Sequence, residues 1–304
     1  MSARELDTSR PLCAEAALGR GEPLAATASR VRRWLLVEYG GQWPYEPLDA
    51  TVFAGALGRR LGERLRELGD ARLCLVKRPG EGRGESVRVF YGTTPGRGGR
   101  FRQLELASHG ELDDLDLGAM LREVDGPGEP VTHPLLLVCT HGVRDRCCAK
   151  YGQELCKALS AITPAGWVWQ ASHVGGDRFA GNLVVLPEGL YFGRVGREEA
   201  PRLLASYLEG RIDLPCFRGR SAYPFPVQAA EADVRERTGL TGLWDLLHVR
   251  TDRLEDGVWE VGFRAEVSGV AHRVRVERRL GEPELLTCRA EEPRRPRHFA
   301  VTPL

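Results

Sequence analysis

The sequence predicts an α/β protein in which a mixed sheet carries helices on both faces and a small α+β module follows. Three observations support this fold class. Short aliphatic runs alternate with amphipathic helical patterns up to residue 215. The same order of elements occurs before and after the Gly/Pro-rich segment 125–128. Beyond residue 216, alternating apolar and polar residues replace the aliphatic runs.

The first half of the chain has the order strand, helix, strand, loop, strand, strand, helix. Strands are expected at 31–38, 71–76, 87–91 and 102–108, and helices at 53–68 and 112–124. The helix at 53–68 is expected because leucines recur at helical spacing among arginines and glutamates. The segment 78–86 is rich in Gly, Pro and charge and indicates a loop, and residues 1–28 indicate a loose lead-in.

From residue 134 the same order returns. The expected elements are a strand at 134–138 that ends in Cys139, a helix at 145–159, strands at 167–171, 182–186 and 189–195, and a helix at 198–208. Sequential alternation of this kind implies a mixed sheet covered by helices, compatible with a thioredoxin-like layer. We therefore expect two tandem degenerate units, a scaffold domain at 1–128 and a site-bearing domain at 129–215.

Residues 216–304 are expected to form a third, small α+β module. A proline-rich linker at 221–226 precedes a helix at 227–238 and strand-like runs at 243–249, 258–267 and 271–278. Alternation of apolar and polar residues in these runs favours half-buried antiparallel strands. The tail from Glu291 is expected to be mobile.

Composition limits the class of protein. A chain of 304 residues with 42% hydrophobic residues can bury the cores of two or three domains. A formal net charge of +1 gives no electrostatic reason to expect nucleic acid or an anionic membrane as a partner. No apolar window is long enough to span a bilayer, so we expect a cytoplasmic protein. Eight cysteines without a secretory signal are typical of metal ligands, redox groups or buried thiols.

The residues that carry chemistry gather between 139 and 182. Cys139 ends an aliphatic strand, Cys148 opens a helical pattern, and His173 follows the next strand. Open α/β sheets build their sites at this edge, where strands end and helices begin. Two thiols and an imidazole are soft ligands, so the pattern indicates a redox or metal site. The alternative is a pair of buried thiols without a cofactor.

Three segments, CTHGVRDRCC, SHVGGDRFAGN and LVVLPEGLYFGRV, resemble the sucrase/ferredoxin-like family of thioredoxin-like proteins, which includes a yeast actin-patch-associated member. The ferredoxin module of that family has two cysteines spaced Cys-x8-Cys and two histidines spaced His-x3-His. Cys139 and Cys148 match the cysteine pair, and His173 matches the first histidine. The resemblance therefore implies a [2Fe-2S] cluster bound by these three residues.

Asp177 stands at the family's second histidine position and leaves the fourth ligand open. A carboxylate is a harder ligand than an imidazole and suits a sulfide cluster less well. Asp177 could complete the site, Cys147 could replace it, or the cluster could be lost, with Asp177 paired to Arg144 or Arg178. We favour a cluster with Asp177 or Cys147 as the fourth ligand.

Other residues around the cysteines have supporting roles in this hypothesis. Arg144, Arg146 and Arg178 could stabilise thiolates or an anionic partner, although charged loop residues are often only solvated. Gly175 and Gly176 are expected to permit unusual backbone angles and a close approach to a cofactor.

The expected function is electron transfer or redox sensing by a thioredoxin-like ferredoxin with an unidentified redox partner protein. The alternatives are a thiol–disulfide protein without a cluster that uses Cys139 and Cys148, or an interaction module with a degenerate site. Glycoside hydrolysis needs two carboxylates across a sugar site. No acidic pair of that kind stands out, so we expect an electron carrier and no sucrase activity.

Overall fold

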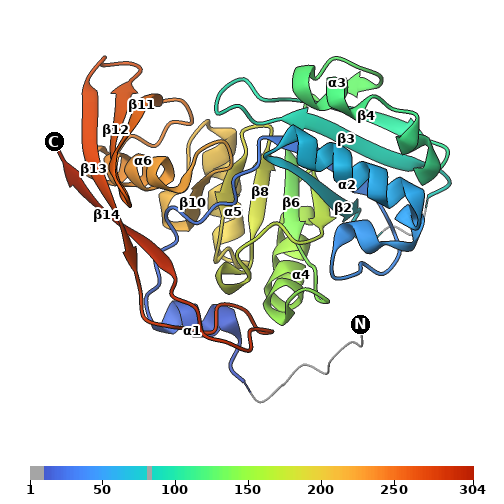
Figure 1. The fold of residues 1–304 in the computed structure, drawn as a ribbon, viewed down its shortest axis with the longest axis horizontal. Helices are drawn as coiled ribbons and strands as arrows, with labels where there is room; N and C mark the ends of the chain where they lie inside the picture. Colours follow the sequence, from blue (N-terminus) through green and yellow to red (C-terminus); the bar gives the residue numbers. More distant parts are fainter. Residues whose placement is uncertain (1–9, 81–83) are drawn as a thin grey trace.

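The fold is described from a computed structural model, which defines residues 10–80 and 84–304. It confirms the α/β class (Figure 1). A ten-stranded mixed sheet has the strand order β10-β9-β8-β6-β7-β2-β1-β3-β4-β5, and a second, antiparallel sheet has the order β11-β12-β13-β14. Part of the predicted lead-in, residues 1–9, and part of the predicted loop, residues 81–83, lie outside the described residues.

The elements follow the predicted order closely. Up to residue 130 they are α1 (Cys13–Gly19), β1 (Arg33–Glu38), α2 (Ala56–Leu68), β2 (Ala71–Lys77), β3 (Val87–Thr93), β4 (Arg100–Leu106), α3 (Leu117–Glu123) and β5 (Glu129–Pro130). The next group is β6 (Leu135–Cys139), α4 (Arg146–Ser160), β7 (Val168–Ala171), β8 (Leu183–Leu186), β9 (Leu190–Phe192), α5 (Glu199–Leu208) and β10 (Phe217–Arg220). The C-terminal module contains α6 (Phe225–Thr238), β11 (Leu246–Glu255), β12 (Val258–Ala265), β13 (Ala271–Leu280) and β14 (Arg297–Pro303).

The two halves of the large sheet share one topology. In the first, β1 is parallel to β2 and antiparallel to β3, which pairs with β4. In the second, β6 is parallel to β7 and antiparallel to β8, which pairs with β9. The halves join where β2 pairs antiparallel with β7, so the repeat forms one continuous sheet.

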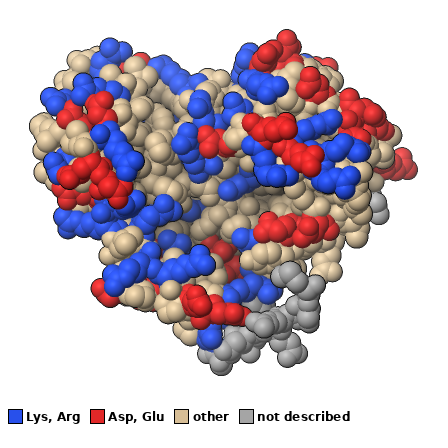
Figure 2. Space-filling view, in the orientation of Figure 1, with Lys and Arg blue, Asp and Glu red and all other residues tan. Residues whose placement is uncertain are grey.

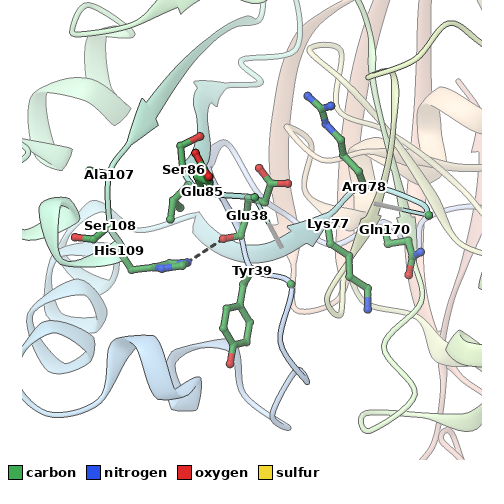
Figure 3. Close-up of a pocket in the computed structure, with 14 residues that line it drawn as sticks. Glu38, Tyr39, Lys77, Arg78, Glu85, Ser86, Ala107, Ser108, His109 and Gln170 are labelled. Atoms are coloured by element: carbon green, nitrogen blue, oxygen red, sulfur yellow. Dashed lines mark hydrogen bonds between the residues drawn. The ribbon is translucent and has the colours of Figure 1, made fainter. Parts of the chain in front are cut away.

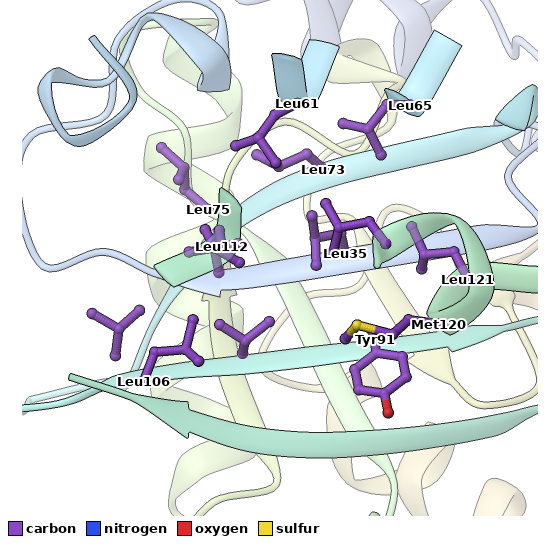
Figure 4. Packing of buried hydrophobic residues seen from close by; sticks show 14 of the residues in the cluster. Leu35, Leu61, Leu65, Leu73, Leu75, Tyr91, Leu106, Leu112, Met120 and Leu121 are labelled. Carbon is purple, nitrogen blue, oxygen red and sulfur yellow. The ribbon is translucent and has the colours of Figure 1, made fainter. Parts of the chain in front are cut away.

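Helices α2 to α5 pack on the same face of this sheet. The core under α2 and α3 includes Leu35, Leu73 and Leu121 (Figure 4). The core under α4 and α5 includes Leu136 and Val168. Paired residues on neighbouring strands point to the same side, and the registers place all of these strand residues on one face. The helices are therefore not divided between two faces as the sequence had indicated.

The opposite face packs largely on itself because the sheet curls. Its core combines Trp34 and Cys74 from the first half with Leu137 and Trp169 from the second. The rings of Phe90 and Trp169 meet edge to face, with centroids 5.1 Å apart. This shared core takes the place of a second helical layer and ties the two halves together.

Two terminal segments are ordered where the sequence predicted loose or mobile chain. Residues 297–303, in the tail expected to be mobile, form β14, which pairs with β13 along its length. Phe299 and Val301 from this strand pack beside α6, so the alternation of apolar residues gives the tail a buried side. Within the expected lead-in, Cys13–Gly19 forms α1, because Cys13 and Ala17 are buried against the rest of the protein.

The surface and the helix lengths bear on possible partners. Acidic and basic side chains are interspersed on the face drawn in Figure 2, in keeping with the formal net charge of +1. Among the described residues, no helix combines the length and the apolar character needed to cross a bilayer.

Candidate functional site

Four side chains meet at the edge of the sheet where β6 and β7 end. Cys139 is the last residue of β6, Cys148 lies in the first turn of α4, and His173 follows β7 by two residues. Asp177 begins a short 3-10 turn at Asp177–Phe179. We call these four residues, Cys139, Cys148, His173 and Asp177, the Cys139 site. The strand ends and the helix start predicted from the sequence therefore converge.

The contacts within the Cys139 site are close. The sulfur atoms of Cys139 and Cys148 and one ring nitrogen of His173 lie within 4.8 Å of one another. The Cys148 thiol donates to Oδ1 of Asp177 at 3.2 Å. Nδ1 of His173 is 3.0 Å from the same oxygen, an ionic contact whose direction does not meet hydrogen-bond geometry. Asp177 thus touches both the helix cysteine and the histidine.

Contacts among the side chains of the Cys139 site shift the pKa values of its two cysteines and its histidine. The hydrogen bond from Cys148 holds the pKa of the Cys139 thiol well below its usual range, and the backbone of His141 adds a further donor. The same contact with Cys139 raises the pKa of Cys148. Burial lowers the pKa of His173, but Asp177 and Cys139 outweigh it and raise that pKa to about 9. The site therefore combines a Cys139 thiol whose pKa is lowered with a His173 imidazole whose pKa is raised.

The Cys139 site is sealed except at the histidine. Both cysteines are 1% exposed, whereas the side chain of His173 is 20% exposed. His173 lines an open cavity of about 700 Å³ together with Tyr45 and Arg144. The ring of His173 is therefore reached from solvent through that cavity.

Arg218 positions the loop that carries His173 and Asp177, a role that could not be predicted from the sequence. The side chain is 1% exposed and donates to the carbonyl of Gly175 at 2.9 Å, to Oδ1 of Asn182 at 2.7 Å and to the carbonyl of Thr27 at 2.6 Å. Burial lowers the pKa of Arg218 to about 10, so it stays charged. Arg218 lies far along the chain from His173, so no local sequence pattern indicates that the two are close in space.

The two glycines of the loop make room for the protein's own side chains. Gly175 and Gly176 have φ angles of +102° and +87°, which L side chains rarely adopt. A Cβ on Gly175 would lie 2.3 Å from Oγ of Ser29, and one on Gly176 would lie 2.2 Å from Nη2 of Arg218. The unusual backbone angles are confirmed, but the close neighbours are Ser29 and Arg218.

The three arginines predicted to support the site have different positions. Arg144 bonds Glu46 at 2.6 Å and lies over the ring of Tyr45 at 4.1 Å. Burial raises the pKa of Asp177, but His173, Cys148 and Arg144 together lower it. Arg178 is paired with Glu22 at 2.7 Å, and Arg146 donates to the carbonyl of Arg10 at 3.1 Å. Of the three arginines, Arg144 is the one that lines the cavity of His173.

Cys147 does not belong to the Cys139 site, so its prediction as an alternative fourth ligand is wrong. Its sulfur lies 3.5 Å from the sulfur of Cys13 and 3.5 Å from that of Cys288. Adjacent helical residues do not face each other, and Cys147 and Cys148 therefore point to different neighbours. We call Cys13, Asp145, Cys147 and Cys288 the Cys13 site.

The corresponding strand ends of the first half form a different kind of site. A cavity of about 360 Å³ at the ends of β1 and β2 is lined by Glu38, Lys77, Arg78 and His109, among others (Figure 3). Nε2 of His109 lies 2.9 Å from the carbonyl oxygen of Glu38. None of the residues that line this cavity is a cysteine. This cavity therefore lacks the thiol ligands of the Cys139 site.

Comparison with known proteins identifies relatives of this chain. A family model described as sucrase/ferredoxin-like matches residues 24–219, more than half of the chain and all of the Cys139 site. No solved structure matches the chain.

Two similar proteins are both named altered inheritance of mitochondria protein 32. The one from Eremothecium gossypii is 34% identical over 109 residues, which are 30% of this chain and 34% of that protein. The one from Meyerozyma guilliermondii is 32% identical over 101 residues, which are 30% of this chain and 36% of that protein. The matches thus span about a third of the length of each relative.

Proposed function

The chain belongs to the sucrase/ferredoxin-like family, and on that premise we propose that it binds one [2Fe-2S] cluster and carries or senses electrons. The residues that would hold the cluster are Cys139, Cys148, His173 and Asp177. The observation that carries the proposal is the convergence of two buried thiols, an imidazole and a carboxylate at one sheet edge. When bound, a cluster of this kind supplies one-electron transfer.

Three of the four donors, two thiols and an imidazole, fit the cluster, and the carboxylate of Asp177 suits it less well. Thiolates and imidazoles are the ligands found on [2Fe-2S] centres with mixed ligation. Nearby groups hold the pKa of the Cys139 thiol well below its usual range. The Cys148 thiol donates to Oδ1 of Asp177 at 3.2 Å, and it would release its proton to solvent on becoming a ligand, which leaves Asp177 as a carboxylate. The donors also occur as two contacting pairs, Cys139 with Cys148 and His173 with Asp177.

The partly exposed ring of His173 gives the proposed carrier one point of exchange. The cavity beside it is lined by Tyr45 and Arg144, where a redox partner protein would dock. All eight cysteines are free, which suits a reducing compartment such as the cytoplasm. We accordingly infer a cytoplasmic location. As argued from the carboxylates, we also expect no enzymatic activity on sugars.

A second function is favoured by one specific contact. The sulfur atoms of Cys139 and Cys148 lie within 4.8 Å of each other, and their contact holds the pKa of the Cys139 thiol well below its usual range. A thiolate beside a thiol is the starting arrangement for a reversible disulfide, in which two electrons and one proton leave the pair and reduce an oxidised thiol partner. The chain could in this case act as a thiol–disulfide protein without a cluster.

Anaerobic reconstitution with iron and sulfide separates the two functions. The ferredoxin function predicts red-brown protein with about two iron and about two acid-labile sulfide atoms per chain. Cys139→Ala and Cys148→Ala should each abolish the visible spectrum. Cys156→Ala is the matched control, because Cys156 is a buried thiol on the same helix and lies outside both sites.

The opposite results are equally clear. A normal spectrum in Cys139→Ala or Cys148→Ala would remove the ligand assignment. Colourless wild-type protein whose two thiols titrate as a disulfide would replace the ferredoxin function by the second one.

A further inference from the structure

The Cys13 site brings together three thiols and one carboxylate from distant parts of the chain. Cys13 begins α1, Asp145 is the N-cap of α4, Cys147 lies in its first turn, and Cys288 lies between β13 and β14. One ligand atom from each of the four lies within 4.8 Å of all the others. Their exposed fractions are 9% or less, so the four groups are shielded from solvent.

The spacing of these atoms suits one metal ion. Sγ of Cys147 lies 3.5 Å from Sγ of both Cys13 and Cys288. Both carboxylate oxygens of Asp145 lie 3.7 Å from Sγ of Cys13. A tetrahedral zinc ion with bonds of about 2.3 Å to sulfur separates two sulfur ligands by about 3.8 Å.

The backbone around the site is arranged to support negative sulfur and oxygen atoms. The N–H of Cys13 donates to Sγ of Cys288, and the N–H of Ala14 donates to Sγ of Cys147, each at 3.5 Å. Asp145 accepts from the N–H of Cys147 at 2.9 Å and from the N–H of Cys288 at 2.7 Å. These bonds fix the carboxylate among the thiols, as the supporting contacts of metal ligands do.

Apolar packing at this place is limited. The buried hydrophobic group contains Ala14 and Ala180 besides the three cysteines, and Leu12 and Tyr151 are partly buried against it. Residues 281–296, which include Cys288, contain no helix or strand apart from the isolated bridge between Glu284 and Arg294. Figure 1 shows this C-terminal segment lying beside α1. A metal ion would add to the hydrogen bonds and packing that hold the two segments against α4.

We propose that Cys13, Asp145, Cys147 and Cys288 bind one Zn²⁺ ion as a structural site. The ion clasps α1 and the segment before β14 to the first turn of α4. Each thiol gives up its proton to solvent as it binds the ion. This site is separate from the Cys139 site and does not depend on the function proposed for it. Because Cys147 precedes Cys148 on α4, the ion also fixes the turn that presents Cys148.

Metal analysis of the full chain tests the site. Protein purified under reducing conditions with zinc supplied should hold one zinc ion per chain. Cys13→Ser and Cys288→Ser should each reduce the zinc content to background. Cys74→Ser is the matched control, because Cys74 is another buried thiol outside the site, and it should retain the ion. The double variant Cys139→Ser/Cys148→Ser should also retain it.

Cobalt substitution of the wild-type chain keeps the test independent of how well the variants fold. Co²⁺ should produce thiolate-to-metal charge-transfer absorption and the visible bands of a tetrahedral ion, which added Zn²⁺ abolishes. Wild-type protein that takes up neither ion, or whose mass shows a disulfide among these cysteines, overturns the proposal. So does an ion that the Cys139→Ser/Cys148→Ser variant loses and the Cys13→Ser variant keeps. Iron in place of zinc overturns the choice of metal.

Discussion

Two neighbouring cysteines at the start of α4 belong to two different sites. Cys148 faces Cys139, His173 and Asp177, all within one stretch of the chain. Cys147 faces Cys13 and Cys288, which are 134 and 141 residues away in sequence. The first site opens to a cavity through His173, whereas all four residues of the second are buried.

This difference in exposure matches the roles proposed for the two sites, electron exchange at the Cys139 site and stabilisation of the fold at the Cys13 site. An electron carrier needs one ligand near the surface, and the side chain of His173 is the most exposed of the four in the Cys139 site. A structural metal site needs complete coordination by protein ligands and shielding from solvent. It contributes most to the stability of the fold when it joins segments that have little packing of their own. One helical turn thus serves both sites, because adjacent residues on it point in different directions.

The largest expected effect is the contrast between serine substitutions at Cys147 and at Cys148. Cys147→Ser should lose zinc and reduce the free energy of unfolding by about 4 kcal/mol, the stabilisation by a ligand present at about 1,000 times its Kd. Cys148→Ser should keep zinc and most of the stability but lose the visible spectrum. Urea unfolding measures the free energy of unfolding of each variant, metal analysis its zinc content, and visible absorption its cluster. Equal losses of stability and zinc in both variants would contradict the division into two sites.

An intermediate effect is expected at Asp177, the position where the chain departs from the family pattern. Asp177→His should slow cluster loss in air, because imidazole is a better match for iron than a carboxylate oxygen. It should also raise the reduction potential, by on the order of 100 mV, because one negative charge leaves the ligand set. Redox titration and the half-life of the visible spectrum measure both changes.

Asp177→Asn serves as the control for this substitution, because it removes the charge without supplying an imidazole. Zinc content should stay constant in both variants. An unchanged potential and half-life in Asp177→His would mean that Asp177 is not a ligand and only contacts His173.

The smallest expected effect is at Arg144. Its ion pair with Glu46 is partly exposed, so Arg144→Gln should change the free energy of unfolding by less than about 1 kcal/mol. The reduction potential should fall slightly, because a positive charge near Asp177 is removed. Arg178→Gln, at an arginine paired with Glu22, is the matched control and should leave the potential closer to that of the wild type. A larger shift in Arg178→Gln than in Arg144→Gln would contradict this assignment.

The sequence by itself determined the elements that build the Cys139 site. The apolar runs of β6 and β7 indicate buried strands, and the apolar spacing in α4 indicates a helix with one buried side. Strand ends and helix starts meet at one sheet edge, so Cys139, Cys148 and His173 could be brought together without a structure. The repeated order of elements likewise predicted the shared topology of the two halves.

Only the tertiary structure decided the rest. Arg218 and the partners of Cys147 come from segments far away in the chain, and no local period reports a contact of that kind. The curled sheet placed α2 to α5 on one face because its other face could bury itself. Strand β14 became ordered because β13 offered it an edge and α6 offered it an apolar surface. Such contacts depend on which surfaces remain uncovered after the local elements have packed.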